Sequence, residues 1–158
     1  MRRLDIVDAT PVLVGRVSDR LRHADAVELA ASSGMEPAQA LAAAYLLSGE
    51  CKCALADGVP LALLGVDPLG GGAGAPWMVG TTELEKYPRQ LLVQGRELVS
   101  GWLERFSILV NFVHAENARS IAYLYKLGFT IDEQRPHGPL SAPFHPFYRR
   151  ACLCVDQQ

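Results

Sequence analysis

The clearest pattern of hydrophobic and polar positions lies in residues 107–129. Residues 107–114 form a nearly unbroken apolar run, rich in branched and aromatic side chains, which is typical of a strand buried on both faces. Apolar positions then recur at helical spacing between Asn117, a candidate N-cap, and Gly128, a candidate left-handed stop. This spacing places Tyr125 on the apolar stripe of the helix and therefore predicts that it lies in the core.

The pattern at the start of the chain predicts one strand and two helices. Residues 4–8 alternate between apolar and polar positions, as a strand at a sheet edge does. The first helix is predicted to begin at Ser18, a plausible N-cap, and to end at Gly34. The second is predicted to begin at Pro37, in the first-turn position that suits proline, and to end at Gly49.

Two strands joined by a tight turn are predicted next. Asp57-Gly58 separates the apolar runs 51–56 and 59–66, and both turn residues of such a hairpin must accept a positive φ. Residues 68–76 are rich in glycine and proline, which predicts a mobile hairpin tip. They lack the Gly-Lys-Ser/Thr ending of a phosphate-binding loop, so we do not expect them to hold a nucleotide.

The second half of the chain is predicted to add strands around one long helix. A strand covers residues 77–82, and a helix with a period of about 3.6 residues opens at Pro88. After the central stretch, a strand is predicted over residues 130–134, a loop over 135–146 and a last strand over 147–155.

The size and composition of the chain fit one domain. It has 158 residues, 49% of them hydrophobic and 20% charged, and no repeat, linker or charge run divides it. We predict one α+β domain over residues 1–158, with about seven strands in a mixed, mostly antiparallel sheet and about four helices. Residues 1–3 and 156–158 are expected to be frayed.

The charge and hydropathy of the chain exclude two classes of partner. A net charge of −2 and a pI near 6.1 create no field that would attract nucleic acid. No apolar run approaches the roughly 20 residues that span a bilayer, and the chain meets Asp5 where a signal peptide would have an apolar core. We therefore expect a soluble protein that stays in the compartment where it is made.

Four cysteines form two pairs, Cys51 with Cys53 and Cys152 with Cys154, in strand-like segments. Each pair would share one sheet face, so a site of four thiolates is conceivable if the two strands were neighbours. Structural zinc sites usually place cysteines in loop knuckles instead. We therefore predict no metal site and expect reduced, buried or half-buried thiols.

The central stretch resembles the second half of the Gcn5-related N-acetyltransferase (GNAT) fold, in which a strand feeds an Asn-capped helix that ends in a Leu-Gly-Phe turn. Asn117 and residues 127–129 carry this resemblance. The predicted order of elements, β, α, α, β, β, β, α, β, α, β, β, is the GNAT order throughout. The resemblance implies transfer of an acetyl group from acetyl-CoA to an amine, but a fold by itself does not establish an activity.

The resemblance implies that the pyrophosphate of CoA would lie between the fourth strand and the long helix, on a glycine-rich turn. Residues 82–90 contain no glycine there, and they bring Glu83 and Glu85 close to the place of the anion. Pro88 also removes one backbone donor. Lys86 and Arg89 could attract the anion as point charges, although both also suit a solvated surface.

The resemblance also implies a tyrosine that protonates the departing thiolate, and the matching position holds Leu124. Tyr123 and Tyr125 flank it, but each residue of a helix turns the side chain by about 100°, so neither projects where the acid would. Tyr123 is expected at a surface or interface. Tyr125 remains the candidate acid if the protein is active.

Glu83 is the candidate base for the amine, because it lies near the end of the fourth strand. Asn117 matches the family's asparagine and is a candidate cofactor contact, although an N-cap role explains it equally. His137 and His145 lie in the late loop, where an acceptor could approach. No carboxylate is paired with them in the sequence, so we expect surface histidines.

The whole chain, over roughly residues 5–150, also resembles a family of small GNAT-like proteins of short-tailed bacteriophages, which includes an internal virion protein. That family also has leucine in place of the tyrosine and no glycine-rich cradle. The residues that carry this resemblance are 28–37, Pro60 to Ala62, Gly65, Pro76, Trp77, Thr81, 111–113 and 117–128. The resemblance implies a role inside the virion or in its assembly.

Our main expectation is therefore a degenerate acetyltransferase that binds no cofactor and acts through contacts with other virion or assembly proteins, or as a homo-oligomer. It would work in the host bacterial cytoplasm and in the virion interior. The alternative is an acetyl-CoA-dependent N-acetyltransferase with an atypical CoA site, which would use Glu83 and Tyr125 for catalysis and Lys86, Arg89 and Asn117 for the cofactor. A third option is a host-modulating binding module made early in infection.

Overall fold

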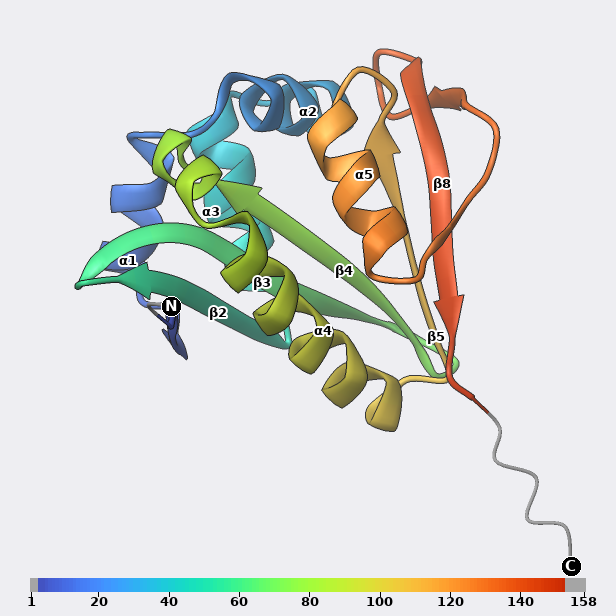
Figure 1. Cartoon of the computed structure of the whole chain (residues 1–158). Helices are drawn as coiled ribbons and strands as arrows, with labels where there is room; N and C mark the ends of the chain where they lie inside the picture. The colour runs from blue at the N-terminus through green and yellow to red at the C-terminus, as the bar shows by residue number, and fades with distance from the viewer. Residues whose placement is uncertain (1–2, 153–158) are drawn as a thin grey trace, which may run out of the picture.

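A computed structural model describes residues 3–152 of the chain (Figure 1). It contains five α-helices, one 3-10 helix and eight strands within that range. In chain order these are β1 (Asp5–Asp8), α1 (Pro11–Ser18), α2 (His23–Ser33), α3 (Pro37–Leu47), β2 (Glu50–Ala56), β3 (Val59–Gly70), β4 (Ala73–Gly80), η1 (Thr82–Lys86), α4 (Pro88–Arg105), β5 (Ile108–His114), α5 (Ala118–Lys126), β6 (Thr130–Ile131), β7 (Arg135–His137) and β8 (Ala142–Arg150).

The strands form one sheet in the order β1-β2-β3-β4-β5-β8-β6, with β7 paired to β8. All neighbours are antiparallel except β4 and β5, which run parallel. These two strands pair only at Ala73 with Ile108 and at Gly74 with Leu109. Beyond that point they diverge, and Figure 1 shows the gap that widens between them toward their carboxyl ends.

Helices cover both faces of the sheet, and each face has its own core. Leu63 and Leu64 on β3 show the division, because successive side chains of a strand point to opposite faces. Leu64 packs in the core beneath α4 and α5, together with Val99 and Trp102. Leu63 packs in the core beneath α1 and α3, together with Leu41. Figure 1 shows α4 and α5 in front of the sheet.

The predicted helix over residues 18–34 begins too early, because α1 ends at Ser18, a break follows, and α2 begins only at His23. Helix α1 itself is not among the predictions. Thr10 caps α1 through a bond from the Leu13 N–H (3.3 Å). The break exists because the backbone here pairs with the end of β4 and the residue after it: Leu21 forms a bridge with Thr81, and the Arg22 N–H donates to the Gly80 carbonyl (2.9 Å). These contacts between distant residues prevent the helix from continuing. The left-handed stop at residue 34 is confirmed by its φ of 71°.

The Asp57-Gly58 turn is confirmed, with φ values of 49° and 77°. The mobile hairpin tip predicted over residues 68–76 is much shorter in the structure. The ladder between β3 and β4 continues through Pro68 and Gly74, which leaves only Gly71-Gly72 as the turn. Both of these glycines have positive φ values, so the run of glycines serves a tight hairpin instead of a flexible loop.

The C-terminal strands also differ from the prediction. The strand predicted over residues 130–134 is shortened to β6, and the loop predicted over 135–146 contains β7 and the first half of β8. The last strand starts at Ala142 because it pairs along the whole of β5. Its predicted end beyond residue 152 lies outside the described residues, as does Cys154.

Three cysteines lie within the described residues, and all three are free thiols. Cys53 is fully buried in β2 and Cys51 is half-buried, and burial raises their pKa values to about 11 and about 12. Cys152 is exposed after β8. Within residues 3–152, no group of three or more His, Cys, Asp or Glu side chains is placed to hold a metal ion. No helix in that range combines the length and hydropathy of a membrane span.

Candidate functional site at the gap between β4 and β5

The gap between β4 and β5 exposes part of the β4 backbone. Thr81 donates its N–H to Leu61 on the β3 side, so by strand alternation residues 74, 76, 78 and 80 direct their backbone groups toward β5. The Asn111 side-chain amide of β5 bonds the Pro76 carbonyl across the gap (2.9 Å). At Gly80 the N–H donates to the Asp25 carboxylate (2.7 Å). Between these two points, the backbone N–H of Met78 faces the gap.

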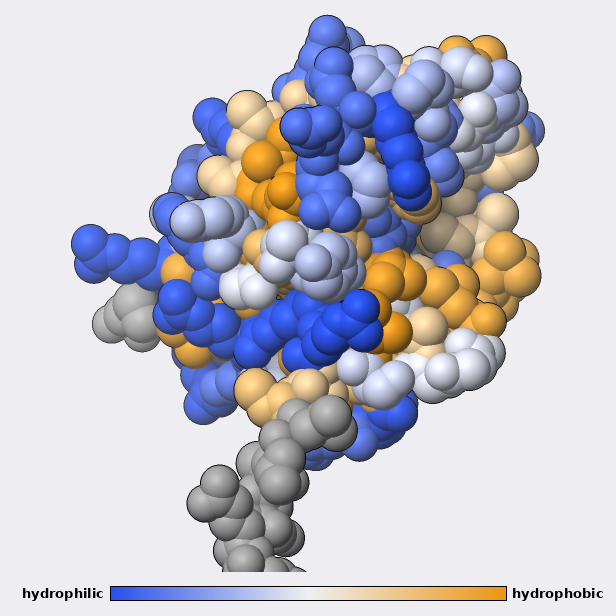
Figure 2. Space-filling model, turned by 90° about the vertical axis from the view of Figure 1, so that its right-hand side faces the viewer, coloured by the Kyte–Doolittle hydropathy of each residue, from blue (hydrophilic) through white to orange (hydrophobic). Residues whose placement is uncertain are grey.

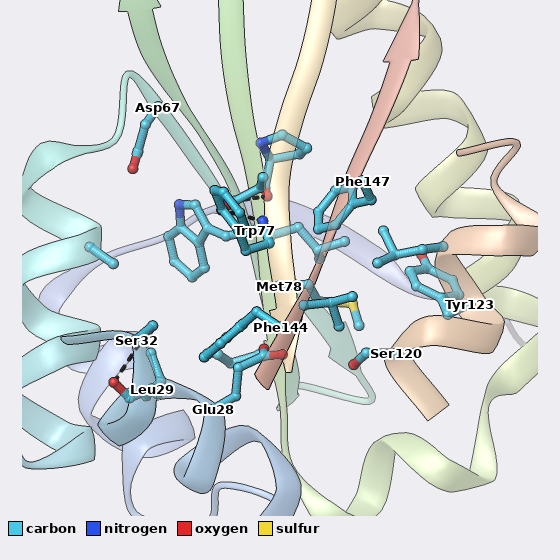
Figure 3. A pocket seen from close by; sticks show the side chains of 18 of the residues that line it. Glu28, Leu29, Ser32, Asp67, Trp77, Met78, Ser120, Tyr123, Phe144 and Phe147 are labelled. Carbon is cyan, nitrogen blue, oxygen red and sulfur yellow. Dashed lines mark hydrogen bonds between the residues drawn. The ribbon is translucent and has the colours of Figure 1, made fainter. Parts of the chain in front are cut away.

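A cavity of about 440 Å³ occupies this gap and crosses the sheet. Its wall includes Met78 and Val99 from the core beneath α4 and α5, and also Trp77 and Val79, which pack in the opposite core. Figure 3 shows the strands running through the middle of the cavity, with labelled side chains on both sides of them. The cavity therefore has two lobes that meet at the gap, one under α4 and α5 and one under α2 and α3.

Two carboxylates of α2 bind the diverging ends of β4 and β5. Asp25 is 1% exposed and accepts bonds from Arg22 Nε (2.9 Å), the Gly80 N–H (2.7 Å) and Asn117 Nδ2 (3.2 Å). Glu28 lies one turn later in α2 and accepts the backbone N–H of His114, the last residue of β5 (2.6 Å). The helix thus spans the open end of the gap through hydrogen bonds to both strands.

Glu28 lines the cavity with a strongly perturbed carboxyl group. Loss of hydration on burial raises its pKa to about 7, and the negative charge of Asp25 acts in the same direction. The bond from the His114 N–H, the Asn117 amide and the charge of Arg22 oppose this shift. A carboxyl group with a pKa near neutrality, on the wall of a cavity, can accept and release a proton under physiological conditions.

The residues predicted to hold a pyrophosphate lie in η1 and at the start of α4. Glu83 pairs with Lys86 (2.8 Å), and Glu85 pairs with Arg119 at the start of α5. Pro88 occupies the first turn of α4, whose N-cap makes no side-chain bond. Of the two predicted cations, Lys86 is thus already paired with a carboxylate and Arg89 is exposed at the start of α4. The 3-10 helix η1 replaces the glycine turn. This part of the chain does not fit a pyrophosphate cradle.

Tyr125 does not lie in the core, so that prediction is wrong. Its side chain is 75% exposed, and it does not line the cavity. The inward stripe of α5 is Ser120, Tyr123, Leu124 and Leu127, one position away from the predicted stripe. The sequence allowed both assignments because α5 is short, and the packing against α4 selected one.

Tyr123 lies at the interface between α5 and α4. Its hydroxyl donates to the Leu91 carbonyl (3.0 Å), and it packs where Gly95 leaves room. Burial raises the pKa of its phenol well above 10. A phenol that already donates to a backbone carbonyl, with a pKa raised by burial, is a poor proton donor to a substrate.

Asn117 is confirmed as the N-cap of α5, since its Oδ1 accepts the Ser120 N–H (3.4 Å). Of the two late histidines, His137 lines the cavity and stacks on Phe112 at 3.7 Å. His145 instead places its Nδ1 2.8 Å from the Asp132 carbonyl. Burial and the charge of Arg135 lower the pKa of His137, which favours the neutral ring.

Asp25 and Glu28 are not among the site residues predicted from the sequence. Glu28 counts among the helical positions from Ser18 to Gly34, and the one local signal is that Asp25 and Glu28 lie one turn apart. Two acids at this spacing are equally typical of a solvated helix face. Only the approach of β4 and β5 shows which partners they have.

No protein-family model matches the chain. No curated protein matches it either. Solved structures do resemble it, among them a ribosomal-protein-alanine N-acetyltransferase from Brucella melitensis, with a TM-score of 0.69, 17% identity and coverage of 93% of this chain and 99% of that one. Ard1 from Thermoplasma volcanium has a TM-score of 0.69 and 13% identity, over 96% of this chain and 99% of its own.

A GNAT-superfamily phosphinothricin acetyltransferase from Sinorhizobium meliloti, solved in complex with acetyl-CoA, has a TM-score of 0.65 and 13% identity, over 95% of this chain and 89% of its own. Identities this low show the fold alone. The structural similarities confirm the predicted α+β GNAT fold, and the strand pairings confirm its mixed, mostly antiparallel sheet. The five helices exceed the predicted four because α1 lies before the first predicted helix and is not among the predictions.

Proposed function

We propose that this GNAT-fold chain is an N-acyltransferase that moves an acyl group from a CoA thioester to an amine. One observation carries the proposal: the cavity crosses the sheet at the gap between β4 and β5, and Glu28 lies on its wall. Such a passage lets a donor and an acceptor approach from opposite faces and meet between the strands. The acetyl-CoA complex of the phosphinothricin acetyltransferase with this fold supports the choice of donor.

The α4 and α5 lobe is the side that would receive the pantetheine arm. Its wall is mostly apolar, with Leu98, Leu124 and Leu127 among its residues. By strand alternation, the Met78 N–H faces the gap beside it. When bound, the thioester supplies an acyl group: the amine nitrogen forms the new C–N bond, the C–S bond breaks, and the thiolate leaves. A backbone N–H held at the gap is suited to stabilise negative charge on a carbonyl oxygen.

Glu28 would accept the proton that the amine must lose. An alkyl ammonium group is not a nucleophile, and a base with a pKa near the working pH removes its proton most effectively. With a pKa of about 7, Glu28 is ionised in a large fraction of molecules at neutral pH. This role replaces the one predicted for Glu83, which is paired with Lys86 on η1.

The nucleotide end of the donor would be held weakly. Glu83 and Glu85 lie where the pyrophosphate of CoA would pass, and Lys86 and Arg119 already neutralise them. Arg89 is exposed at the start of α4 and would attract the anion from solvent. We therefore expect a high KM for acetyl-CoA and slow turnover, because Leu124 also provides no proton for the thiolate.

The test combines ligand binding with turnover. Acetyl-CoA at millimolar concentration should raise the melting temperature, since a ligand of the folded state stabilises it. Thiol release with a panel of amines should fall about a hundredfold in Glu28→Gln, with the thermal shift by acetyl-CoA retained. Glu104→Gln, an exposed carboxylate of α4 away from the cavity, is the matched control. Absence of both the thermal shift and thiol release would contradict the proposal.

A second candidate function is that of a non-catalytic GNAT-fold protein of a short-tailed phage. Such a protein would bind other proteins in the virion or during its assembly, and it would also form homo-oligomers. Two observations favour it: Leu124 stands where a tyrosine acid would, and η1 replaces the phosphate cradle. Mass spectrometry of purified particles and of assembly intermediates tests it. The presence of the protein there, without any effect of acetyl-CoA on its stability, would favour this candidate over the enzyme.

A further inference from the structure

We propose that the α2 and α3 lobe binds an alkyl amine as the acyl acceptor, and that it prefers an aliphatic diamine over a monoamine. This inference rests on the proposed function, but it concerns a binding site that can be tested without the donor. It comes from the charges and the apolar surface that line this half of the cavity, and from where the two carboxylates lie.

The wall of this lobe is mostly hydrocarbon. Helix α3 contributes small and aliphatic side chains, and the sheet contributes aromatic ones. The residues concerned are Leu29, Ala40, Ala43, Ala44, Leu47, Trp77, Phe112 and Phe144. Such a wall gains free energy by removing methylene groups from water, about 0.8 kcal/mol for each buried CH₂ group. A strongly polar acceptor would gain nothing from it.

The charged groups on this wall all have the same sign. Glu28 and Asp67 are the charged side chains among the described lining residues, which include neither lysine nor arginine. His137 also lines the lobe, but its lowered pKa favours the neutral form. The lobe therefore attracts a cation and repels a carboxylate.

The two carboxylates lie at opposite ends of the lobe. Figure 3 shows Glu28 at one end, near the gap, Asp67 at the other end, and Trp77 between them. The Ser48 hydroxyl is 2.6 Å from Asp67 Oδ1 and accepts the Trp77 Nε1–H (2.8 Å), which fixes the indole beside the second carboxylate. An apolar segment with an acid at each end is complementary to a hydrocarbon chain with a cation at each end.

The lobe opens to solvent through a hydrophobic rim. Leu47 is 74% exposed and Met35 is 39% exposed, and both line the cavity. Figure 2 shows hydrophobic residues gathered beside a hollow at the right of the view. A rim of this kind admits an apolar chain without a cost in unpaired polar groups.

The experiment measures binding of four molecules with the same hydrocarbon chain to the full-length protein, by calorimetry without any donor. The set is hexylamine, hexamethylenediamine, hexanol and hexanoate, at about pH 8, where a carboxyl group with a pKa near 7 is ionised. We expect hexylamine to bind about tenfold tighter than hexanol, the diamine tighter than hexylamine, and hexanoate weakest.

Two variants test which carboxylate binds each ammonium group of the diamine. Glu28→Gln should weaken hexylamine and the diamine alike, by about tenfold. Asp67→Asn should weaken the diamine by a similar factor and leave hexylamine within about twofold. Glu104→Gln should change neither affinity, because its side chain does not line the cavity. Urea unfolding of each variant identifies any variant that fails to fold. Binding of the four ligands of different charge to the unaltered protein tests the proposal independently of the variants.

The outcomes separate this inference from the proposed function. Equal affinities for hexylamine and hexanol, tighter binding of hexanoate, or no heat with any of the four molecules at millimolar concentration would overturn the inference. Thiol release from acetyl-CoA with a lysine peptide but not with the alkyl amines would also overturn it, while supporting the enzyme. Tight amine binding without any acyl transfer would support the inference as a binding site and count against the enzyme.

Discussion

At the scale of single residues, Glu28 shows how a site can arise from an ordinary helix position. Its carboxylate lost hydration when β5 approached, and the hydrogen bond from His114 only partly offsets that loss. Nearby charges are few: Asp25 opposes ionisation and Arg22 favours it, both from the start of α2, and Asn117 adds a neutral amide from α5. The result is an acid that titrates near neutrality.

This shift predicts a pH dependence of stability. The folded pKa of Glu28, about 7, lies above the ordinary value of 4.5 for a glutamate, so between these values the folded state binds more protons than the unfolded state. The free energy of unfolding should therefore fall as pH rises through this window, by roughly 3 kcal/mol at most from this group. Urea titrations at about pH 5 and about pH 8 should show a fall that Glu28→Gln lacks. Equal pH slopes in both proteins would contradict the prediction.

Gly95 supports a second prediction at this scale. A Cβ there would overlap the Tyr123 hydroxyl, so Gly95→Ala should destabilise the protein by about 1–3 kcal/mol. Gly101 lies in the same helix with open space at its Cβ position, and Gly101→Ala should stabilise by about 0.5–1 kcal/mol. Thermal unfolding measures both. Adding Tyr123→Phe to Gly95→Ala should recover part of the loss, and stabilisation by Gly95→Ala alone would contradict the packing.

At the scale of elements, α2 keeps β4 and β5 apart. Two diverging parallel strands leave backbone groups without partners, and α2 satisfies some of them with its own acids, Asp25 for Gly80 and Glu28 for His114. The break between α1 and α2 brings Arg22 into the same cluster, where it bonds Asp25 (2.9 Å). The helix therefore determines the width of the gap as well as the chemistry of its wall.

Asp25→Asn tests this role of α2. The side chain is 1% exposed, and the three groups that bond it are all donors. An amide in its place would direct its own donors against them and leave Arg22 without its partner, which should cost about 3 kcal/mol of stability. Urea unfolding measures the loss. Asp19→Asn, an exposed position after α1, should change stability by less than about 0.5 kcal/mol; equal effects at both sites would contradict the role.

The ion pairs at η1 and α5 give a prediction for the donor. Glu85→Gln should release Arg119 from its pair and remove one negative charge near the start of α4. The affinity for acetyl-CoA should then rise about threefold at low salt, and the gain should shrink at high salt because exposed charges are screened. Calorimetry at two salt concentrations measures it. An unchanged or weaker affinity would place the nucleotide elsewhere.

At the scale of the whole molecule, the cavity joins two cores that the sheet would otherwise separate. Val99 and Trp102 belong to one core and Leu41 and Leu63 to the other, and the gap between β4 and β5 is where the cavity passes between them. Ligands that enter from opposite faces should therefore be blocked independently.

Two substitutions that fill one lobe each test this arrangement. Ala44→Phe should abolish amine binding and leave the thermal shift by acetyl-CoA, while Leu124→Trp should do the reverse, because these residues line different lobes. Each is expected to cost about 1–3 kcal/mol through overpacking, which urea unfolding measures. If both variants fold but neither binds the amine or acetyl-CoA, the cavity behaves as a single site and the prediction is wrong.

Much of the fold could be predicted from the sequence, because its signals are local. The turn at Asp57-Gly58, the cap at Asn117 and the stop at Gly34 each depend on the conformations open to a few adjacent residues. The predictions that are wrong concern contacts at long range. The predicted first helix includes Leu21, which instead bridges Thr81 just after β4. The predicted core position of Tyr125 is wrong, because Tyr123 packs against that core instead.

Residue types that are adjacent or regularly spaced along the chain are enough to predict the α+β fold, most of its elements and the lack of a glycine cradle in residues 82–90, but not α1 or β7. The location of the candidate site follows from tertiary contacts alone. They bring α2 to the ends of β4 and β5 and place Glu28 on the wall of a cavity. No local pattern could show this, because the pKa of a carboxyl group depends on the loss of water around it, and residues far away in the chain exclude that water.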